Sequence, residues 1–134
     1  MNNIIKSTFA IALSFLAFTG VSQAAETVKS GSWTKKEQKI AGTWKITEDA
    51  GNMKLTLTDL KTKKAPDLKI FFSSKPLGSV TAKTATKGSF FLKKLSSHKG
   101  TQSYALPKGF DVSKYKSILI HCEKYTKLWG GANL

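Results

Sequence analysis

Residues 53–60, MKLTLTDL, alternate between apolar and polar side chains, and this stretch decides the fold class of the chain. In an extended strand, Met53, Leu55 and Leu57 face one side, and the intervening lysine and threonines face the other. This two-residue period is typical of an antiparallel strand that has one face in the core and the other in water.

Other short apolar runs are separated by turn-forming residues in the same way. The run 117–122, SILIHC, is the most hydrophobic of them and predicts a central, buried strand. Gly42 indicates a bulge in an earlier strand. The sequence has no convincing amphipathic helix, so it predicts an all-β domain, an antiparallel β-sandwich or barrel-like fold of about seven or eight short strands. The expected strands are 39–47, 53–60, 67–73, 89–95, 101–106, 117–122 and 125–129.

The first 24 residues have the three parts of a secretory signal peptide. Lys6 gives the short polar start its charge, residues 9–18 form an apolar run, and small residues surround Ala24. The run is shorter than the roughly 20 residues of a membrane-spanning helix. We therefore expect cleavage after Ala24, or after Ala25, and export to the periplasm or the extracellular space. An uncleaved N-terminal anchor is the alternative.

The remainder of the chain has the length of one domain. Residues 25–38 are small and polar, and they predict a flexible lead-in whose Trp33 docks on the body of the protein. Residues 39–134 are expected to form the β domain. No stretch after the signal peptide is apolar enough to predict a transmembrane segment.

The charge of the chain is strongly positive, and lysine alone supplies it. The sequence has 22 lysines, no arginine and eight carboxylates, which give a net charge of +14. Such a charge attracts anionic surfaces and acidic partners. Arginine is the side chain that binds phosphate and guanine in bidentate fashion, so its absence argues against sequence-specific nucleic-acid binding. The densest lysine cluster is Lys61, Lys63 and Lys64.

The sequence holds a single cysteine, Cys122, which has no partner for an internal disulfide. Cys122 has the strand parity of Ile118 and Ile120, whereas His121 shares the opposite face with Leu119. This geometry disfavours a metal ion shared by the two neighbours, and a zinc site lacks further ligands. Four interpretations of Cys122 stay open: an inert core thiol, an intermolecular disulfide, a redox thiol, and a metal or haem ligand.

Motifs for conventional enzyme chemistry are missing from the sequence. It contains no C-x-x-C, no C-x-x-C-H and no G-x-S-x-G, so neither a dithiol, nor covalent haem attachment, nor a nucleophile elbow is predicted. Glu48 and Asp49 lie beside Gly51. The sequence favours a turn here over a general acid–base pair. We expect no conventional catalytic activity.

The last third of the chain carries a three-part pattern. A Gly-x-Gln-x-Tyr segment ends in proline, an Asp-x-Ser-x-Tyr segment follows, and an apolar strand ends in cysteine before an aromatic–glycine pair and a final Ala-x-Leu. The pattern resembles the DM-thirteen domain, an electron-transfer family of many exported proteins. His121 departs from it, because the family commonly has tryptophan there. The matching positions are Gly100, Gln102, Tyr104, Leu106, Pro107, Asp111, Val112, Ser113, Tyr115, Ile118 to Ile120, Cys122, Trp129, Gly130, Ala132 and Leu134.

The resemblance implies an all-β fold and a redox-active cysteine, either as a bare thiol or as the ligand of a prosthetic group such as haem. It makes Cys122 the redox candidate, with His121, Tyr104 and Trp129 as neighbours and an unidentified redox protein as partner. The alternative function is a non-enzymatic, lysine-rich β-sandwich module that binds an anionic surface or a protein partner. A haem would need an apolar pocket, for which the available side chains are Trp33, Trp44, Phe71, Phe90, Phe91 and Trp129.

Overall fold

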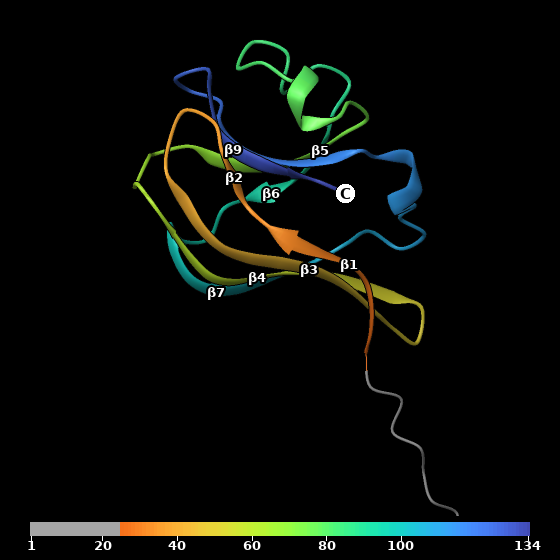
Figure 1. Ribbon diagram of the computed structural model, residues 1–134. Helices are drawn as coiled ribbons and strands as arrows, with labels where there is room; N and C mark the ends of the chain where they lie inside the picture. Colours follow the sequence, from red (N-terminus) through yellow and green to blue (C-terminus); the bar gives the residue numbers. More distant parts are fainter. Residues whose placement is uncertain (1–24) are drawn as a thin grey trace, which may run out of the picture.

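The computed structural model describes residues 25–134, which form two antiparallel β-sheets packed face to face (Figure 1). One sheet has the strand order β1-β3-β4-β7, and the other has the order β2-β9-β8-β5-β6. The all-β prediction is confirmed, while the predicted signal peptide, residues 1–24, lies outside the described residues. The strands are β1 (Glu26–Ser32), β2 (Thr34–Lys35), β3 (Ile40–Asp49), β4 (Asn52–Thr62), β5 (Leu68–Ser73), β6 (Phe90–Lys94), β7 (Lys99–Ala105), β8 (Ser117–Cys122) and β9 (Lys127–Asn133).

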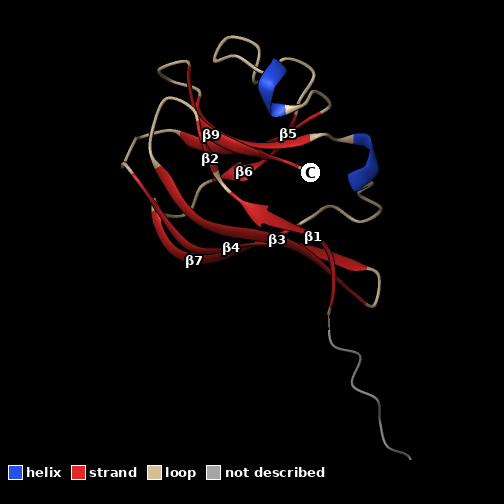
Figure 2. Cartoon of the chain, in the orientation of Figure 1, coloured by secondary structure: helices blue, strands red, loops and turns tan. Residues whose placement is uncertain are grey.

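The helical elements of residues 25–134 are two short 3-10 helices, η1 (Leu77–Ser79) and η2 (Val112–Lys114) (Figure 2). The segment that contains η1 lies over the outer face of the five-stranded sheet (Figure 1). Helix η2 lies at one end of the sandwich. Within the part of the chain that the structure describes, no helix is long and apolar enough to cross a membrane.

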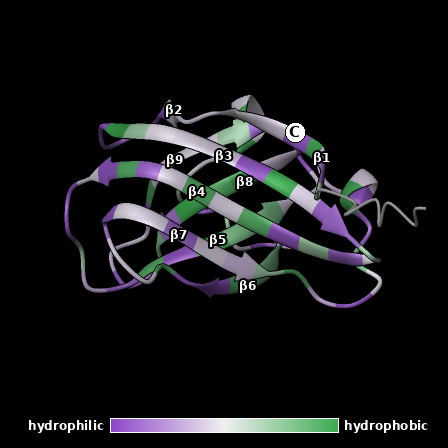
Figure 3. Cartoon of the chain, turned by 90° about the horizontal axis from the view of Figure 1, so that it is seen from below, coloured by the Kyte–Doolittle hydropathy of each residue, from purple (hydrophilic) through white to green (hydrophobic). Residues whose placement is uncertain are grey.

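The main core fills the space between the two sheets and is built from the apolar positions of the alternating strands. In β4, Leu55 and Leu57 are fully buried, while Lys54, which precedes Leu55, is exposed. Figure 3 shows these polar and apolar bands along β3 and β4. A second, smaller cluster lies on the outer face of the five-stranded sheet and consists of Phe71, Leu77, Val80, Ala85, Leu119 and Leu128.

Residues 25–38 differ from the expected flexible lead-in, because they contain two strands. Strand β1 pairs with β3, and β2 pairs with β9, where Thr34 lies opposite Gly131. The chain therefore passes from one sheet to the other here. Trp33 lies at this crossing and is buried in the main core, as the sequence predicted. The strands escaped prediction because β1 is an edge strand whose side chains are mostly exposed, so it needs no apolar face.

The bulge predicted at Gly42 is confirmed. The register of β3 against β4 shifts between Ala41 and Thr43, and Gly42 has a φ of 105°. A Cβ atom at this position would lie 2.6 Å from the carbonyl oxygen of Thr58, a distance that side-chain carbons do not tolerate. Glycine is therefore required here both by its backbone angle and by the close approach of β4.

We expect Gly42→Ala to lower the free energy of unfolding by about 2 kcal/mol or more, because a Cβ there forces both strain and a backbone clash. Gly88→Ala is the matched control, since Gly88 also has a positive φ, 64°, but open space around its Cα. Its expected loss is about 1 kcal/mol. Chemical denaturation measures both values, and equal losses would contradict the role assigned to the close approach.

Candidate functional site around Cys122

Cys122 is the last residue of β8, a strand whose six residues are all buried. Its Cα pairs with Leu68 of β5 and with Lys127 of β9. The side chain is 0% exposed and belongs to the main core together with Ile118 and Ile120. The parity argument from the sequence is therefore confirmed for this face of β8, and the thiol lies in an apolar environment.

His121 lies on the opposite face of β8, beneath the segment that contains η1. Its Nε2 atom is 2.9 Å from the carbonyl oxygen of Ala82, so the ring donates a hydrogen bond there. Its ring also meets the ring of Phe71 edge-on, with centroids 6.1 Å apart. His121 therefore fixes the outer segment to the sheet, and it does not face the thiol of Cys122.

A metal site at this point has no support from the arrangement of side chains. His121 and Cys122 point to opposite faces of the sheet, so one ion does not reach both. Among residues 25–134, no group of three or more histidine, cysteine, aspartate or glutamate side chains is placed to hold a metal ion.

Tyr104 reaches the main core from β7, in the other sheet, and its hydroxyl is used in a hydrogen-bond network. The hydroxyl donates to Oε1 of Gln102 at 2.5 Å and accepts from the amide of Ser96 at 2.8 Å. Gln102 in turn accepts from the amide of Ser97 at 3.1 Å and donates to its carbonyl at 2.9 Å. Together, the two side chains attach the loop between β6 and β7 to β7.

We expect Tyr104→Phe to lower the free energy of unfolding by about 1–2 kcal/mol, because the amide of Ser96 then loses its partner in a part-buried position. Tyr125→Phe serves as the control, since the Tyr125 side chain is exposed, and a change within about 0.5 kcal/mol is expected. Thermal or chemical unfolding provides the measurement. An unaffected Tyr104→Phe variant would show that the loop does not depend on this hydroxyl.

Trp129 lies at an irregular point of β9. Ile120 pairs with Gly130 and His121 with Leu128, so Trp129 is an extra residue between the two pairs. Its ring is buried in the main core, while its carbonyl oxygen accepts from the amides of Lys36 and Gln38, each at 3.2 Å. The bulge thus places Trp129 in the same core as Cys122 and joins its backbone to the segment after β2.

Three tryptophans of the main core, Trp33, Trp44 and Trp129, each have a buried indole Nε1 without a hydrogen-bond partner. The rings of Trp33 and Trp44 are close, with centroids 6.5 Å apart. Such unpartnered donors are rare in protein interiors.

The side chains expected to line a haem pocket do not share one. Trp33, Trp44 and Trp129 lie in the core between the sheets, whereas Phe71 lies in the cluster on the outer face and Phe91 is 47% exposed. A thiolate-ligated haem needs the sulfur in the wall of a cavity. The sulfur of Cys122 is instead enclosed by packed apolar side chains. The arrangement therefore does not fit a haem held by Cys122.

Two residues of the core that contains Cys122 reach grooves at the surface. Leu68, the cross-strand partner of Cys122, lines a groove of about 290 Å³. Trp129 lines another, of about 530 Å³. Lys64 and Ala65 line both grooves, and the residue that pairs with Cys122, Leu68, forms part of the wall of the first.

A sequence model of the electron-transfer DM13 family matches residues 32–134. The chain belongs to this family. The match covers all but the first described strand, and it agrees with the resemblance to the DM-thirteen domain. No curated protein and no solved structure is significantly similar to the chain.

Two further residues of the DM13 pattern, Asp111 and Tyr115, have structural roles in this chain. Asp111 caps η2 by accepting from the amide of Ser113 at 3.0 Å and from its hydroxyl at 2.5 Å. Tyr115 stacks on Phe110, with ring centroids 5.2 Å apart and an interplanar angle of 5°. Asn133, in the final strand, accepts from the amide of Leu77 at 2.8 Å. These contacts fix the segments that flank β8.

The hydrogen bonds from the Ser113 hydroxyl and amide hold the pKa of the Asp111 carboxyl below its ordinary value of 3.8. The cap therefore stabilises the fold above that value, and this contribution is lost as the pH falls through the lowered pKa. We expect Asp111→Ala to be less stable than the wild type near pH 7 and to approach it near pH 2. Unfolding curves at both pH values test this, and a gap that persists in acid would exclude the charged cap as its cause.

Proposed function

We propose that this chain is an exported electron-transfer module whose redox group is Cys122, acting as a bare thiol. The family match to electron transfer DM13 supports the general role. Cys122 is the single cysteine of the sequence. The observation that carries the assignment is its place at the end of β8, where its cross-strand partner Leu68 also forms part of a groove wall.

Burial determines how such a thiol reacts. A fully enclosed sulfur meets an oxidant when the neighbouring loops open, and local opening of this kind has a lower free energy than global unfolding. With a peroxide as oxidant, the sulfur takes up one oxygen and becomes a sulfenic acid, the peroxide is reduced to water or an alcohol, and the sulfur loses two electrons. A partner thiol then condenses with the sulfenic acid to form a mixed disulfide and release water. A second thiol of the partner attacks this mixed disulfide, so that Cys122 leaves as a thiol and the partner keeps the oxidation as its own disulfide.

We expect native protein treated with hydrogen peroxide to form a sulfenic acid at Cys122 that dimedone traps and mass spectrometry detects. Leu68→Ala is expected to speed this reaction, because it removes the groove wall beside the sulfur. Leu55→Ala, a fully buried core residue in the other sheet, is the control for general loss of stability. The proposal is contradicted if the thiol stays unmodified until the protein is unfolded, or if both variants speed sulfenic acid formation equally.

The absorption spectrum of the purified protein provides a separate check. The packing around the sulfur leads us to expect no haem band that depends on Cys122. Such a band in the wild type that disappears in Cys122→Ala would contradict both the packing argument and the bare-thiol mechanism.

A second candidate function is a non-enzymatic module that attaches to an anionic surface or partner through its lysines. The net charge of +14 favours it. Binding of this kind weakens steeply with salt and survives Cys122→Ala, whereas binding that requires the cysteine refutes it.

A further inference from the structure

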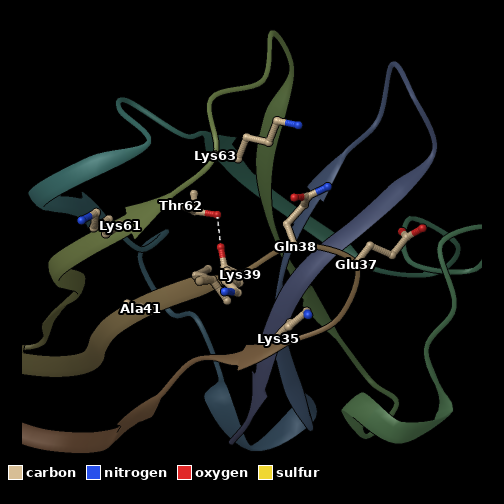
Figure 4. Close-up of a pocket in the computed structure, with 9 residues that line it drawn as sticks. Lys35, Glu37, Gln38, Lys39, Ala41, Lys61, Thr62 and Lys63 are labelled. Atoms are coloured by element: carbon tan, nitrogen blue, oxygen red, sulfur yellow. Dashed lines mark hydrogen bonds between the residues drawn. The ribbon is translucent and has the colours of Figure 1, made fainter.

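A lysine-lined groove crosses the end of the sandwich near Cys122. Lys35 and residues 37–41 and 61–63 line about 810 Å³ there, and four of these residues are lysines: Lys35, Lys39, Lys61 and Lys63. Figure 4 shows these side chains around the groove, with Thr62 donating a hydrogen bond to the carbonyl oxygen of Lys39. The lysines come from β2, from the segment before β3 and from the end of β4.

The 530 Å³ groove continues from the first, because Gln38 and Lys63 line both. It adds Lys64 and Lys127, as well as the exposed ring of Tyr125 and the buried ring of Trp129. The two grooves together form one cleft, which we call the lysine cleft. Its six lysines are Lys35, Lys39, Lys61, Lys63, Lys64 and Lys127.

The charge of the lysine cleft is not balanced by the protein itself. Its one carboxylate, Glu37, accepts a hydrogen bond from the amide of Leu128 at 2.5 Å and is thereby engaged with β9. Within residues 25–134, both ion pairs belong to Lys69, which binds Glu123 and Asp67 outside the cleft. Six like charges that share one concave surface favour binding of an anion.

The indole of Trp129 forms part of the wall of the lysine cleft. The side chain is 4% exposed, lines the cleft, and has an Nε1 donor without a partner. Trp33 and Trp44 have the same unpartnered donor, so this donor is a property of the core and not of the cleft. The exposed ring of Tyr125, with the ammonium group of Lys124 5.7 Å from its centroid, adds apolar area at the rim.

We propose that the lysine cleft binds an acidic segment of a protein partner, rich in aspartate and glutamate. Lysine is a point charge that suits dispersed carboxylates, whereas the cleft has no arginine to grip phosphate in bidentate fashion. Trp129 is too buried to stack its face on a sugar ring, and Thr62 already uses its hydroxyl on Lys39. The apolar side chains of Ile40 and Pro66 offer contacts that a polypeptide uses.

The proposal deepens the proposed function and rests on it in one respect, that the docked protein is the electron-transfer partner. Weak, charge-steered encounters are typical of such pairs, because opposite charges speed association while leaving dissociation fast. Lys127, which lines the lysine cleft, is the cross-strand partner of Cys122, so a protein bound there lies near the end of β8 that carries the proposed redox group.

The test titrates the mature protein with a poly-glutamate peptide of about 12 residues, followed by calorimetry at low and high salt. We expect Lys39→Glu/Lys63→Glu to weaken binding about tenfold or more, because it places two carboxylates in the cleft. The matched control is Lys54→Glu/Lys108→Glu, which makes the same change of net charge at exposed sites toward the opposite end of the sandwich. Its expected effect is less than about threefold. Circular dichroism verifies that both variants are folded.

Several outcomes would overturn the proposal. Equal weakening in the two double variants means that the peptide responds to net charge and not to the cleft. Tighter, cleft-dependent binding of heparin, or of vesicles containing phosphatidylglycerol, assigns the cleft to a polysaccharide or a membrane. Cys122→Ala is expected to bind the peptide like the wild type, so a failure of the redox proposal leaves this result unchanged.

Discussion

Strand β8 is buried on both of its faces, and the positions of the candidate groups depend on that constraint. One face turns Ile118, Ile120 and Cys122 into the core between the sheets. The other turns Leu119 and His121 under the segment that contains η1. Because successive strand residues point to opposite faces, the sheet itself separates the sulfur from the imidazole, and side-chain rotation does not bring them to one ion.

The same constraint explains what the sequence could predict. The apolar residues of β8 and the alternation in β4 differ sharply from the turns around them, so both strands and the side on which Cys122 lies were predictable. Strand β1 was not, because the edge of a sheet is held by backbone hydrogen bonds that need no apolar side chain. The position of Trp129 in the core depends on a one-residue bulge in β9, and composition carries no signal for it.

The lysine cleft shows why a site can be invisible in a sequence whose composition already indicates its charge. The run 61–64 was evident, but Lys35, Lys39 and Lys127 come from other parts of the chain. They join the run because β2 pairs with β9 and because β3 begins beside the end of β4. Pairing between strands that are distant in sequence thus converts a scattered excess of lysine into one concave surface.

The groove beside Leu68 and the lysine cleft share residues, so the burial of the Cys122 thiol and the shape of the cleft are linked. The loops that would have to move to expose Cys122 include Lys64 and Ala65, which line both the groove over Leu68 and the groove over Trp129. A partner bound at this end therefore contacts the loop of Lys64 and Ala65. It changes the accessibility of Cys122 only if it binds the open and closed arrangements with different affinity, since equal affinity shifts no equilibrium. On these terms, a protein that prefers the open loops would raise the accessibility of the buried thiol by its own binding energy.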